Sequence, residues 1–278
     1  MIDLDAYFAR IGYSGPREAT LPVLQALHEL HPAAITFEAV DCLLDRDISL
    51  DPADIDDKLI RRGRGGYCFE QNSLFFRALQ ALGFQLTPLA ARVRWGRPPG
   101  PPPPRTHRVT RVEIEGRSWL ADVGFGGCVL TAPLRLEPFV EQVTPHDTYR
   151  LAPFPGGVTL EVLRDGDWLP ASDLPLDPCE EADFEMANWW TSKHPSSHFR
   201  HNLLAARTTP EARYALLFNR FTVRPVGGLP SRTTLDADGI EAALSGVFGL
   251  AVEPSWRPLI EAAGRVMSEP SAVATTSR

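Results

Sequence analysis

The sequence predicts an α+β fold, because three consecutive regions of the chain carry different patterns. Apolar residues recur at helical spacing over residues 1–83, short strands broken by Gly, Pro and Asp fill residues 84–190, and residues 191–278 mix strands with helices. Helices and strands segregated along a chain are typical of α+β proteins, here with an antiparallel sheet or barrel in the middle. We therefore expect three domains with these boundaries.

Four helices are expected in the first region. Apolar residues follow helical spacing over residues 3–11 and 20–30, and a short polar helix is expected over residues 54–59. A longer helix is predicted over residues 68–82, because an apolar stripe runs along it and a glycine follows its end. This last helix begins at a cysteine.

A hairpin beside a rigid loop is expected in the middle region. Residues 96–105 (GRPPGPPPPR) hold too many prolines for a helix or a paired strand, so they form a stiff, extended loop. Two strands then turn at Glu115-Gly116, and shorter strands follow. The expected strands cover residues 107–114, 117–123, 148–151, 158–163 and 168–170. In the third region we expect a strand over residues 214–223, helices over 238–248 and 256–266, and a disordered tail from Ser268.

Composition is that of an ordinary soluble globular protein. Of 278 residues, 44% are hydrophobic and 23% are charged, which suits one large domain or two to three small ones. The formal charge of −7 argues against a nucleic-acid binder, which needs a basic face. Residues 1–20 lack the pattern of a signal peptide, and no apolar run is long enough to span a membrane. We expect a cytoplasmic protein.

The cysteines are few and widely spaced, at positions 42, 68, 128 and 179, with no Cys-x-x-Cys pair. Neither a zinc site nor a redox pair is indicated, and without an export signal the thiols should be reduced. A reduced cysteine is either core filler or a nucleophile.

Cys68 has the position of a nucleophile, because N–H groups at a helix N-terminus favour the thiolate form. The preceding Gly65-Gly66 lets the backbone turn tightly into the helix. The alternative is a small core residue at a helix start. Three flanking arginines are expected to add positive charge nearby: Arg61, Arg62 and Arg64.

The predicted hairpin brings a histidine and an aspartate together. A two-residue turn pairs Ile114 with Arg117, which places His107 and Asp122 on one face as diagonal neighbours roughly 7–8 Å apart. An aspartate that accepts from one ring nitrogen leaves the other free to take a proton from a thiol. Taken singly, His107 could equally be an exposed strand residue and Asp122 a strand-end carboxylate.

Two other clusters have weaker signals. The glycines after Asp122, in the segment 124–127 (GFGG), would let backbone N–H groups approach a ligand, although such a turn is more often only a turn. His194, His198 and His201 have spacing that could suit a metal, but Pro195 breaks helical geometry between them, so solvated loop histidines are the simpler interpretation. The neighbouring aromatics Trp189, Trp190 and Phe199 could line a pocket or sit in a core.

These residues occur in segments that resemble the arylamine N-acetyltransferase family. Residues 64–72 (RGGYCFEQN) look like that family's active-site cysteine motif, and residues 105–107 (RTH) and 119–126 (WLADVGFG) look like its histidine and aspartate segments. The likeness runs from about residue 7 to residue 202. Other similar stretches lie near the start, at residues 7–13 (YFARIGY), 20–21, 27–28 and 35–38 (ITFE).

The resemblance implies a ping-pong acetyl transfer. Acetyl-CoA, as co-substrate, would acylate Cys68, and an arylamine or hydrazine would then take the acetyl group. His107 and Asp122 would complete a catalytic triad, with no metal. The implied architecture is a helical bundle carrying the cysteine, an antiparallel β-barrel carrying the other two residues, and an interdomain segment leading to a C-terminal α/β lid. The first two parts would form a papain-like core.

The resemblance also implies binding residues. Phe37, Phe125 and Phe199 match positions that line the acceptor pocket, and Thr106 and Gly126 fall in segments that approach CoA. One departure is Ala39, where many members carry Asn, so any hydrogen bond made by that Asn is lost. The oligomeric state stays open, a homodimer included.

Three other functions would keep some or all of these residues. An amide synthase would use the same triad to close a macrolactam from a carrier-protein thioester, and acetylation of a simple aniline would distinguish the two. A papain-like cysteine hydrolase would use water as acceptor, so hydrolysis of acetyl-CoA faster than transfer would reveal it. A non-enzymatic binding module would have no use for all three catalytic groups.

Overall fold

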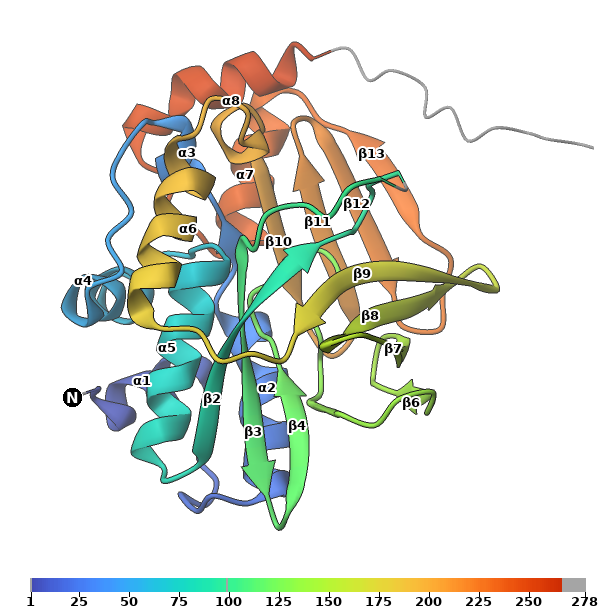
Figure 1. The fold of residues 1–278 in the computed structure, drawn as a ribbon. Helices are drawn as coiled ribbons and strands as arrows, with labels where there is room; N and C mark the ends of the chain where they lie inside the picture. Colours follow the sequence, from blue (N-terminus) through green and yellow to red (C-terminus); the bar gives the residue numbers. More distant parts are fainter. Residues whose placement is uncertain (1, 99, 267–278) are drawn as a thin grey trace, which may run out of the picture.

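The computed structural model describes residues 2–98 and 100–266 of the chain. Helices occupy the N-terminal part, a large antiparallel sheet follows, and a smaller sheet with two further helices ends the described chain (Figure 1). The predicted α+β class is confirmed. No helix among the described residues is long and apolar enough to cross a membrane.

Three helices of the N-terminal part share one apolar core. They are α1 (Leu4–Ile11), α2 (Leu21–Ala34) and α5 (Cys68–Ala81), and their buried side chains include Tyr7, Leu24 and Phe75. The helix α2 runs past the predicted end because His31 and Pro32 are also buried. The short helix expected over residues 54–59 spans two elements. The small elements here are β1 (Phe37–Glu38), α3 (Val40–Leu43), α4 (Pro52–Asp56) and the π-helical turn η1 (Asp57–Arg61).

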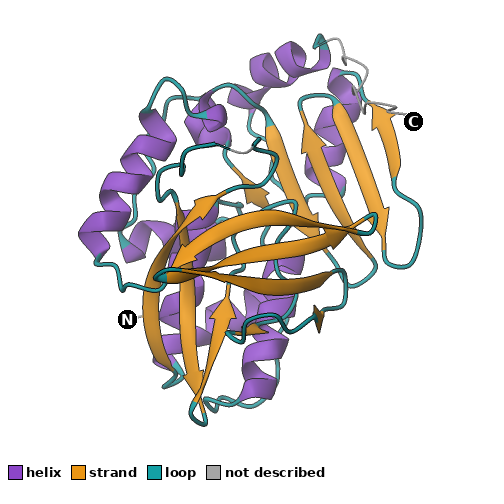
Figure 2. Cartoon of the chain, turned by 45° about the vertical axis from the view of Figure 1, so that its right-hand side comes forward, coloured by secondary structure: helices purple, strands orange, loops and turns teal. Residues whose placement is uncertain are grey.

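The large sheet has the strand order β5-β4-β3-β2-β9-β8-β7-β6, with antiparallel neighbours throughout. It curves so strongly that β7–β9 cross in front of β2–β4 (Figure 2), and strands from both ends bury side chains in one core, among them Leu89, Val109 and Leu160. This is the barrel-like centre of the fold. Its strands are β2 (Gln85–Val93), β3 (His107–Ile114), β4 (Arg117–Ala121), β5 (Leu134–Arg135), β6 (Gln142–Val143), β7 (Thr148–Phe154), β8 (Gly157–Arg164) and β9 (Asp167–Pro175).

The β3–β4 hairpin has the predicted register. Ile114 pairs with Arg117 and Thr110 with Ala121, around the turn at Glu115-Gly116. The second strand ends at Ala121, two residues earlier than expected. Asp122 therefore lies just beyond the paired strand.

The smaller sheet has the order β1-β10-β11-β12-β13, so two residues from the N-terminal part form its edge strand. The single strand expected over residues 214–223 is wrong. The chain turns at Phe218, whose φ is +54°, and makes two strands instead. Helices cover this sheet (Figure 1). The remaining elements are β10 (Leu204–Thr208), β11 (Ala212–Leu217), β12 (Arg220–Pro225), β13 (Ser231–Thr234), α7 (Ala237–Gly246), the 3-10 turn η3 (Pro254–Trp256) and α8 (Arg257–Gly264).

A helix not expected from the sequence, α6 (Glu181–Lys193), lies where short strands were predicted. Most of the side chains it buries are polar, as at Asn188, Thr191 and Ser192, so no apolar stripe marks it in the sequence. The 3-10 turn η2 (His198–Arg200) follows and leads to the smaller sheet. The tail predicted from Ser268 lies outside the described residues.

Candidate active site

Cys68, His107 and Asp122 lie together where the helices meet the large sheet. Cys68 is the first residue of α5, His107 is the first residue of β3, and Asp122 follows the last residue of β4. The exposed fraction of each is 4% or less. Nε2 of His107 lies 2.6 Å from Oδ2 of Asp122, as the predicted register requires. Cys68 and His107 line the same cavity.

The neighbours of His107 control its ionisation. Burial alone would lower the pKa of this imidazole, but the Asp122 carboxylate and hydrogen bonding with Cys68 outweigh burial and raise the pKa to about 10. Burial would likewise raise the pKa of Asp122, but His107 outweighs it and the pKa falls. At neutral pH an imidazolium therefore lies between the carboxylate and the sulfur.

Asn72 holds Asp122 in place from one helical turn beyond Cys68. Its Nδ2 donates to Oδ1 of Asp122 at 2.9 Å, and its Oδ1 accepts from the backbone N–H of Val123 at 3.0 Å. The N–H of Gly124 donates to the same carboxylate oxygen at 3.0 Å. Both Asp122 oxygens thus have partners. Asn72 is the last residue of the cysteine motif at residues 64–72, and its i+4 spacing from Cys68 is the pattern that marks it as a neighbour of that residue on the helix.

His28 supports Asp122 through the backbone. Its Nε2 accepts the N–H of Asp122 at 3.0 Å. A ring nitrogen can accept only when it is unprotonated, and burial lowers the pKa of His28 to about 4. The ring is therefore neutral at physiological pH and suited to this role. No local sequence pattern marks this contact, because His28 and Asp122 are 94 residues apart.

Gly124 allows the segment after Asp122 to pass close to the helix start. A Cβ atom at this position would lie 3.0 Å from Cα of Cys68 and 2.7 Å from Nδ2 of Asn72. Gly126 has a φ of +79°, and a Cβ there would lie 3.3 Å from the ring of Phe37. These glycines permit the close approach of one protein segment to another.

The cavity beside Cys68 has a volume of about 510 Å³, and several Phe and Trp side chains are among the residues that line it. The rings of Phe37 and Phe199 are 6.2 Å apart, and that of Phe125 is 5.2 Å from the His107 ring. Thr106 and Gly126 also line it, and the Thr106 carbonyl oxygen lies 3.7 Å from Sγ of Cys68. The five expected binding residues therefore border one space. Of the neighbouring tryptophans, Trp190 lines the cavity, whereas Trp189 is 63% exposed.

The flanking arginines do not act as expected. Arg61 and Arg62 are exposed, and each pairs with Asp57. Arg64 is buried, but Glu38 and two other carboxylates neutralise it. None is a free cation beside Cys68 within the described residues.

Two further expectations concern hydrogen bonds and metals. Ala39 has no side-chain hydrogen bond to offer, and beside it Oε2 of Glu38 accepts from the N–H of Val40 at 2.8 Å. Among the described residues, no group of three or more His, Cys, Asp or Glu side chains has metal-binding geometry. The histidines near the cavity bond locally: His194 contacts Oγ of Ser196, and His201 contacts the carbonyl of Pro195.

Comparisons with known proteins agree with this picture. The N-acetyltransferase family model matches residues 20–257. The arylamine N-acetyltransferase of Escherichia coli is 41% identical over 252 residues, covering 90% of this chain and 89% of the relative. The structure of the M. tuberculosis arylamine N-acetyltransferase superposes with a TM-score of 0.88 at 38% identity, covering 94% of this chain and 99% of that one. The Mycobacterium marinum enzyme in complex with CoA gives 0.88 at 36% identity, covering 94% and 98%.

The fold and site define a two-sheet α+β protein in which a cysteine, a histidine and an aspartate meet beside an aromatic cavity. The family model covers most of the chain, and the relatives match over nearly their full length. The chain belongs to the arylamine N-acetyltransferase family.

Proposed function

We propose that this chain transfers an acetyl group from acetyl-CoA to an arylamine or hydrazine through a thioester on Cys68. The observation that carries the proposal is the grouping of three side chains: Cys68 and His107 border one cavity, and His107 contacts Asp122 at 2.6 Å. Cys68 is the nucleophile, His107 the proton carrier and Asp122 the orienting carboxylate.

The reaction has two balanced halves. The Cys68 thiolate attacks the acetyl carbonyl, the C–S bond to CoA breaks, and the departing CoA thiolate takes the proton from His107. The amine then attacks acetyl-Cys68, His107 accepts the amine proton, and the Cys68 thiolate leaves as the amide forms. Exchange between two thioesters is nearly isoenergetic, and formation of the amide draws the reaction forward.

The cavity suits this acceptor class. An arylamine is a flat, apolar ring with one reactive nitrogen, and the rings of Phe37, Phe125 and Phe199 offer apolar walls near Cys68. All four cysteines are unpaired and buried, so a free thiol is available at Cys68. A cytoplasmic location, where thiols stay reduced and CoA thioesters are formed, belongs to the same proposal.

The test is mass spectrometry of the protein mixed with acetyl-CoA in the absence of amine. We expect a gain of one acetyl group on Cys68, its removal on adding aniline or a hydrazine, and no acetylation in Cys68→Ser. The Cys42→Ser variant is the matched control, because that thiol is buried away from the cavity lining. Turnover by Cys68→Ser above background would refute the mechanism, and loss of the acetyl group to water faster than to any amine would indicate a hydrolase.

A further inference from the structure

One face of the smaller sheet forms the floor of the cavity. Residues paired directly across antiparallel strands carry their side chains on the same face, and successive residues alternate between the two faces. Phe37 pairs with Ala206, which pairs in turn with Ala215, and all three line the cavity. Ala206 and Ala215 thus form an alanine row beside Phe37. The residues next to them, Ala205 and Leu216, also border the cavity, but they pair with each other and belong to the core that α7 and α8 cover.

Rows of larger residues flank the alanine row on the same face of the sheet. On one side Leu204 pairs with Leu217, and both line the cavity. On the other side Thr208 pairs with Arg213, which is buried and forms an ion pair at 2.7 Å with Asp147, just before β7 of the large sheet. The methyl groups of the alanine row are therefore the low part of the floor, with higher walls along both sides.

This arrangement makes a groove that starts at Phe37, in the cavity that Cys68 also lines. Neighbouring strands lie about 4.8 Å apart, so the alanine row carries the groove roughly 10 Å across the sheet from β1. Strands usually carry larger, β-branched or aromatic residues, and such a residue at either alanine would fill the groove. Its apolar floor suits the hydrocarbon part of a ligand.

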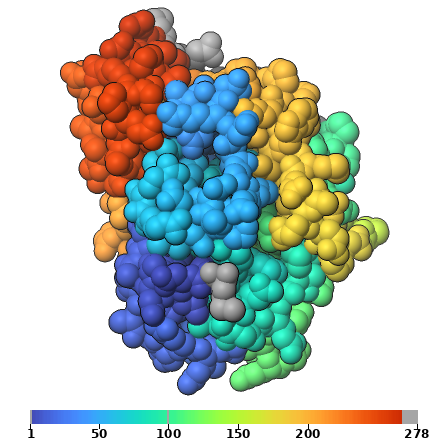
Figure 3. All heavy atoms as spheres, turned by 90° about the vertical axis from the view of Figure 1, so that its left-hand side faces the viewer, coloured from blue at the N-terminus to red at the C-terminus, as the bar shows by residue number. Residues whose placement is uncertain are grey.

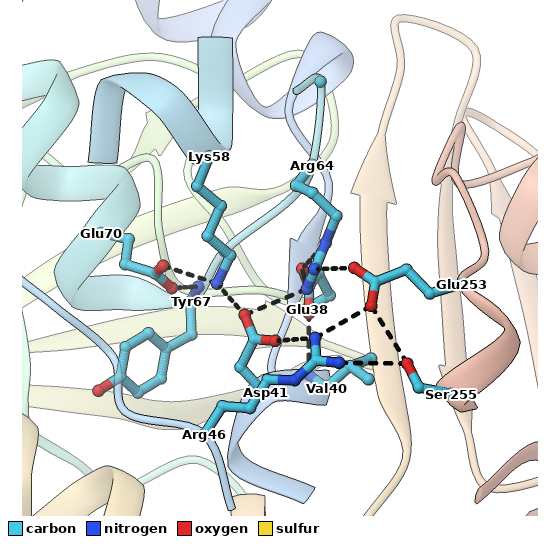
Figure 4. Close-up of polar contacts among 12 residues, drawn as sticks. Glu38, Val40, Asp41, Arg46, Lys58, Arg64, Tyr67, Glu70, Glu253 and Ser255 are labelled. Atoms are coloured by element: carbon cyan, nitrogen blue, oxygen red, sulfur yellow. Dashed lines mark hydrogen bonds and ion pairs between the residues drawn. The ribbon is translucent and has the colours of Figure 1, made fainter. Parts of the chain in front are cut away.

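The strand β1 is held in place, so the groove keeps its width. On the outer face, the segment after β1 lies between the C-terminal part and α6 (Figure 3). Next to Phe37, Oε1 of Glu38 accepts from Nη2 of Arg64 at 2.8 Å, and Nη1 of Arg64 donates to Oε1 of Glu253 at 3.0 Å (Figure 4). The backbone N–H of Glu38 also donates to the carbonyl of Gly66 at 3.1 Å. The size of the side chains in the alanine row therefore decides how much of a ligand the groove admits.

We propose that Ala206 and Ala215 are specificity-determining residues, which admit arylamines that carry an extended apolar substituent opposite the amino group. This inference deepens the proposed function and rests on it, in taking Cys68 as the acetyl carrier and this cavity as the acceptor site. When the nitrogen of an arylamine lies at Cys68, the para position of its ring points away from the sulfur. A substituent at that position extends along the alanine row, where apolar burial favours it.

The test compares kcat/KM for 4-ethylaniline and 4-butylaniline, with acetyl-CoA as the donor. The two amines have nearly equal nucleophilicity, so the ratio of their kcat/KM values reports the burial of two methylene groups. The wild type should favour 4-butylaniline about tenfold. In Ala215→Leu, whose side chain fills the groove, this preference should disappear, and Ala215→Val should reduce it to about threefold.

The matched control is Ala242→Leu, the same substitution at an exposed position of α7 that does not line the cavity, and it should keep the wild-type preference. Mass spectrometry of acetyl-Cys68 identifies the variants that are folded. Should Ala215→Leu not form it, the smaller changes Ala215→Val and Ala206→Val decide the question.

A wild-type preference below about twofold, or a preference in the folded Ala215 variants within about twofold of the wild-type value, would overturn the proposal. Either result, with normal acetyl-Cys68 formation in the wild type, would remove only this inference. Failure of the wild type to form acetyl-Cys68 would remove the proposed function itself.

Discussion

Asp122 shows how much one side chain can set the chemistry of another. It holds His107 as an imidazolium at neutral pH, and Asn72, Gly124 and His28 hold Asp122 in turn. The carboxylate is buried, so water cannot replace a hydrogen-bond partner that is lost. Small changes at this position should therefore have large effects on the rate.

We expect Asp122→Asn to lower kcat/KM for acetyl transfer by about 10³- to 10⁴-fold, because a neutral amide cannot stabilise the imidazolium and favours the wrong ring tautomer. Steady-state assays with acetyl-CoA and an arylamine measure the effect. Asp165→Asn, in the exposed β8–β9 turn, serves as the control and should retain full activity. A loss smaller than about tenfold would show that Asp122 is not the orienting group.

The three residues of the candidate site could largely be predicted from the sequence, whereas the residues that hold them in place could not. The position of Cys68 at a helix start and the proximity of His107 to Asp122 follow from local patterns, whereas the grouping of all three was expected chiefly from the family resemblance. His28 reaches Asp122 from a distant part of the chain, 94 residues away. Nothing in the local sequence distinguishes it from an ordinary helical residue, since only tertiary packing makes the contact.

Among the elements, helix α2 carries two buried histidines that should make the fold sensitive to acid. Burial lowers the pKa of His28 to about 4 and that of His31 to about 3, so the unfolded chain binds protons that the folded chain excludes. Stability is thus fully present above pH 6.5 and is lost as the pH falls from there toward 4. His107, whose pKa is raised, contributes its full stabilisation below pH 6.5 and does not change in this window.

We expect the free energy of unfolding in urea to fall by about 2 kcal/mol per histidine between pH 7 and pH 5. In His28→Gln, which keeps an acceptor for the Asp122 N–H, the loss over this window should be roughly halved. The control is His201→Gln, an exposed residue of the segment after α6. An identical pH dependence in His28→Gln and the wild type would contradict the assignment.

The proline-rich loop before β3 brings a cation to the cavity. Arg97 lines it beside His198, whose pKa is lowered by burial and by the Arg97 charge. No carboxylate lies on the cavity walls formed by the described residues. This side of the cavity therefore attracts anions, and acetyl-CoA carries several phosphate charges.

We expect Arg97→Gln to raise KM for acetyl-CoA about five- to tenfold, as loss of one exposed charge contact costs about 1 kcal/mol. Turnover of p-nitrophenyl acetate, a donor without phosphates, should not change. Arg94→Gln is the control in the same loop, because Arg94 pairs with Asp173 and does not line the cavity. Equal effects on both donors would mean that Arg97 shapes the loop and does not contact the phosphates.

Two elements escaped prediction for identifiable reasons. Helix α6 buries polar side chains such as Asn188 against the rest of the protein, where Nδ2 donates to the carbonyl of Ile48, so its pattern is not amphipathic. The β11–β12 turn uses Phe218 and Asn219 in place of Gly or Pro, and Asn219 is itself buried, with Nδ2 donating to the carbonyl of Val266. In both cases long-range hydrogen bonds override local sequence preference.

At the scale of the whole molecule, the C-terminal part is locked to the N-terminal part by buried contacts. Trp256 is 1% exposed and stacks under the Arg64 guanidinium at 4.7 Å, and Oγ1 of Thr36 donates to the carbonyl of Phe248. Glu253 adds an ion pair to Arg64. We therefore expect the chain to unfold as one cooperative unit.

Trp256→Ala should lower the free energy of unfolding by about 3–5 kcal/mol, the cost of emptying a large buried aromatic site. Trp189→Ala, which removes a side chain that is 63% exposed, should change it by less than about 0.5 kcal/mol. Urea titrations followed by circular dichroism provide both values. A separate early transition in Trp256→Ala, with the rest of the protein unaffected, would show that the C-terminal part folds independently.

The edge strand β1 has a consequence for how the enzyme is made. Phe37, a wall of the cavity, pairs with Ala206, which also borders it, and Leu216 on β11 closes the same space. During synthesis, Cys68, His107 and Asp122 are made before β10, the strand with which Phe37 pairs. The residues of β10 and β11 that border the cavity are therefore made last, and a chain truncated before them would hold the three side chains without the closed cavity that we propose for the amine.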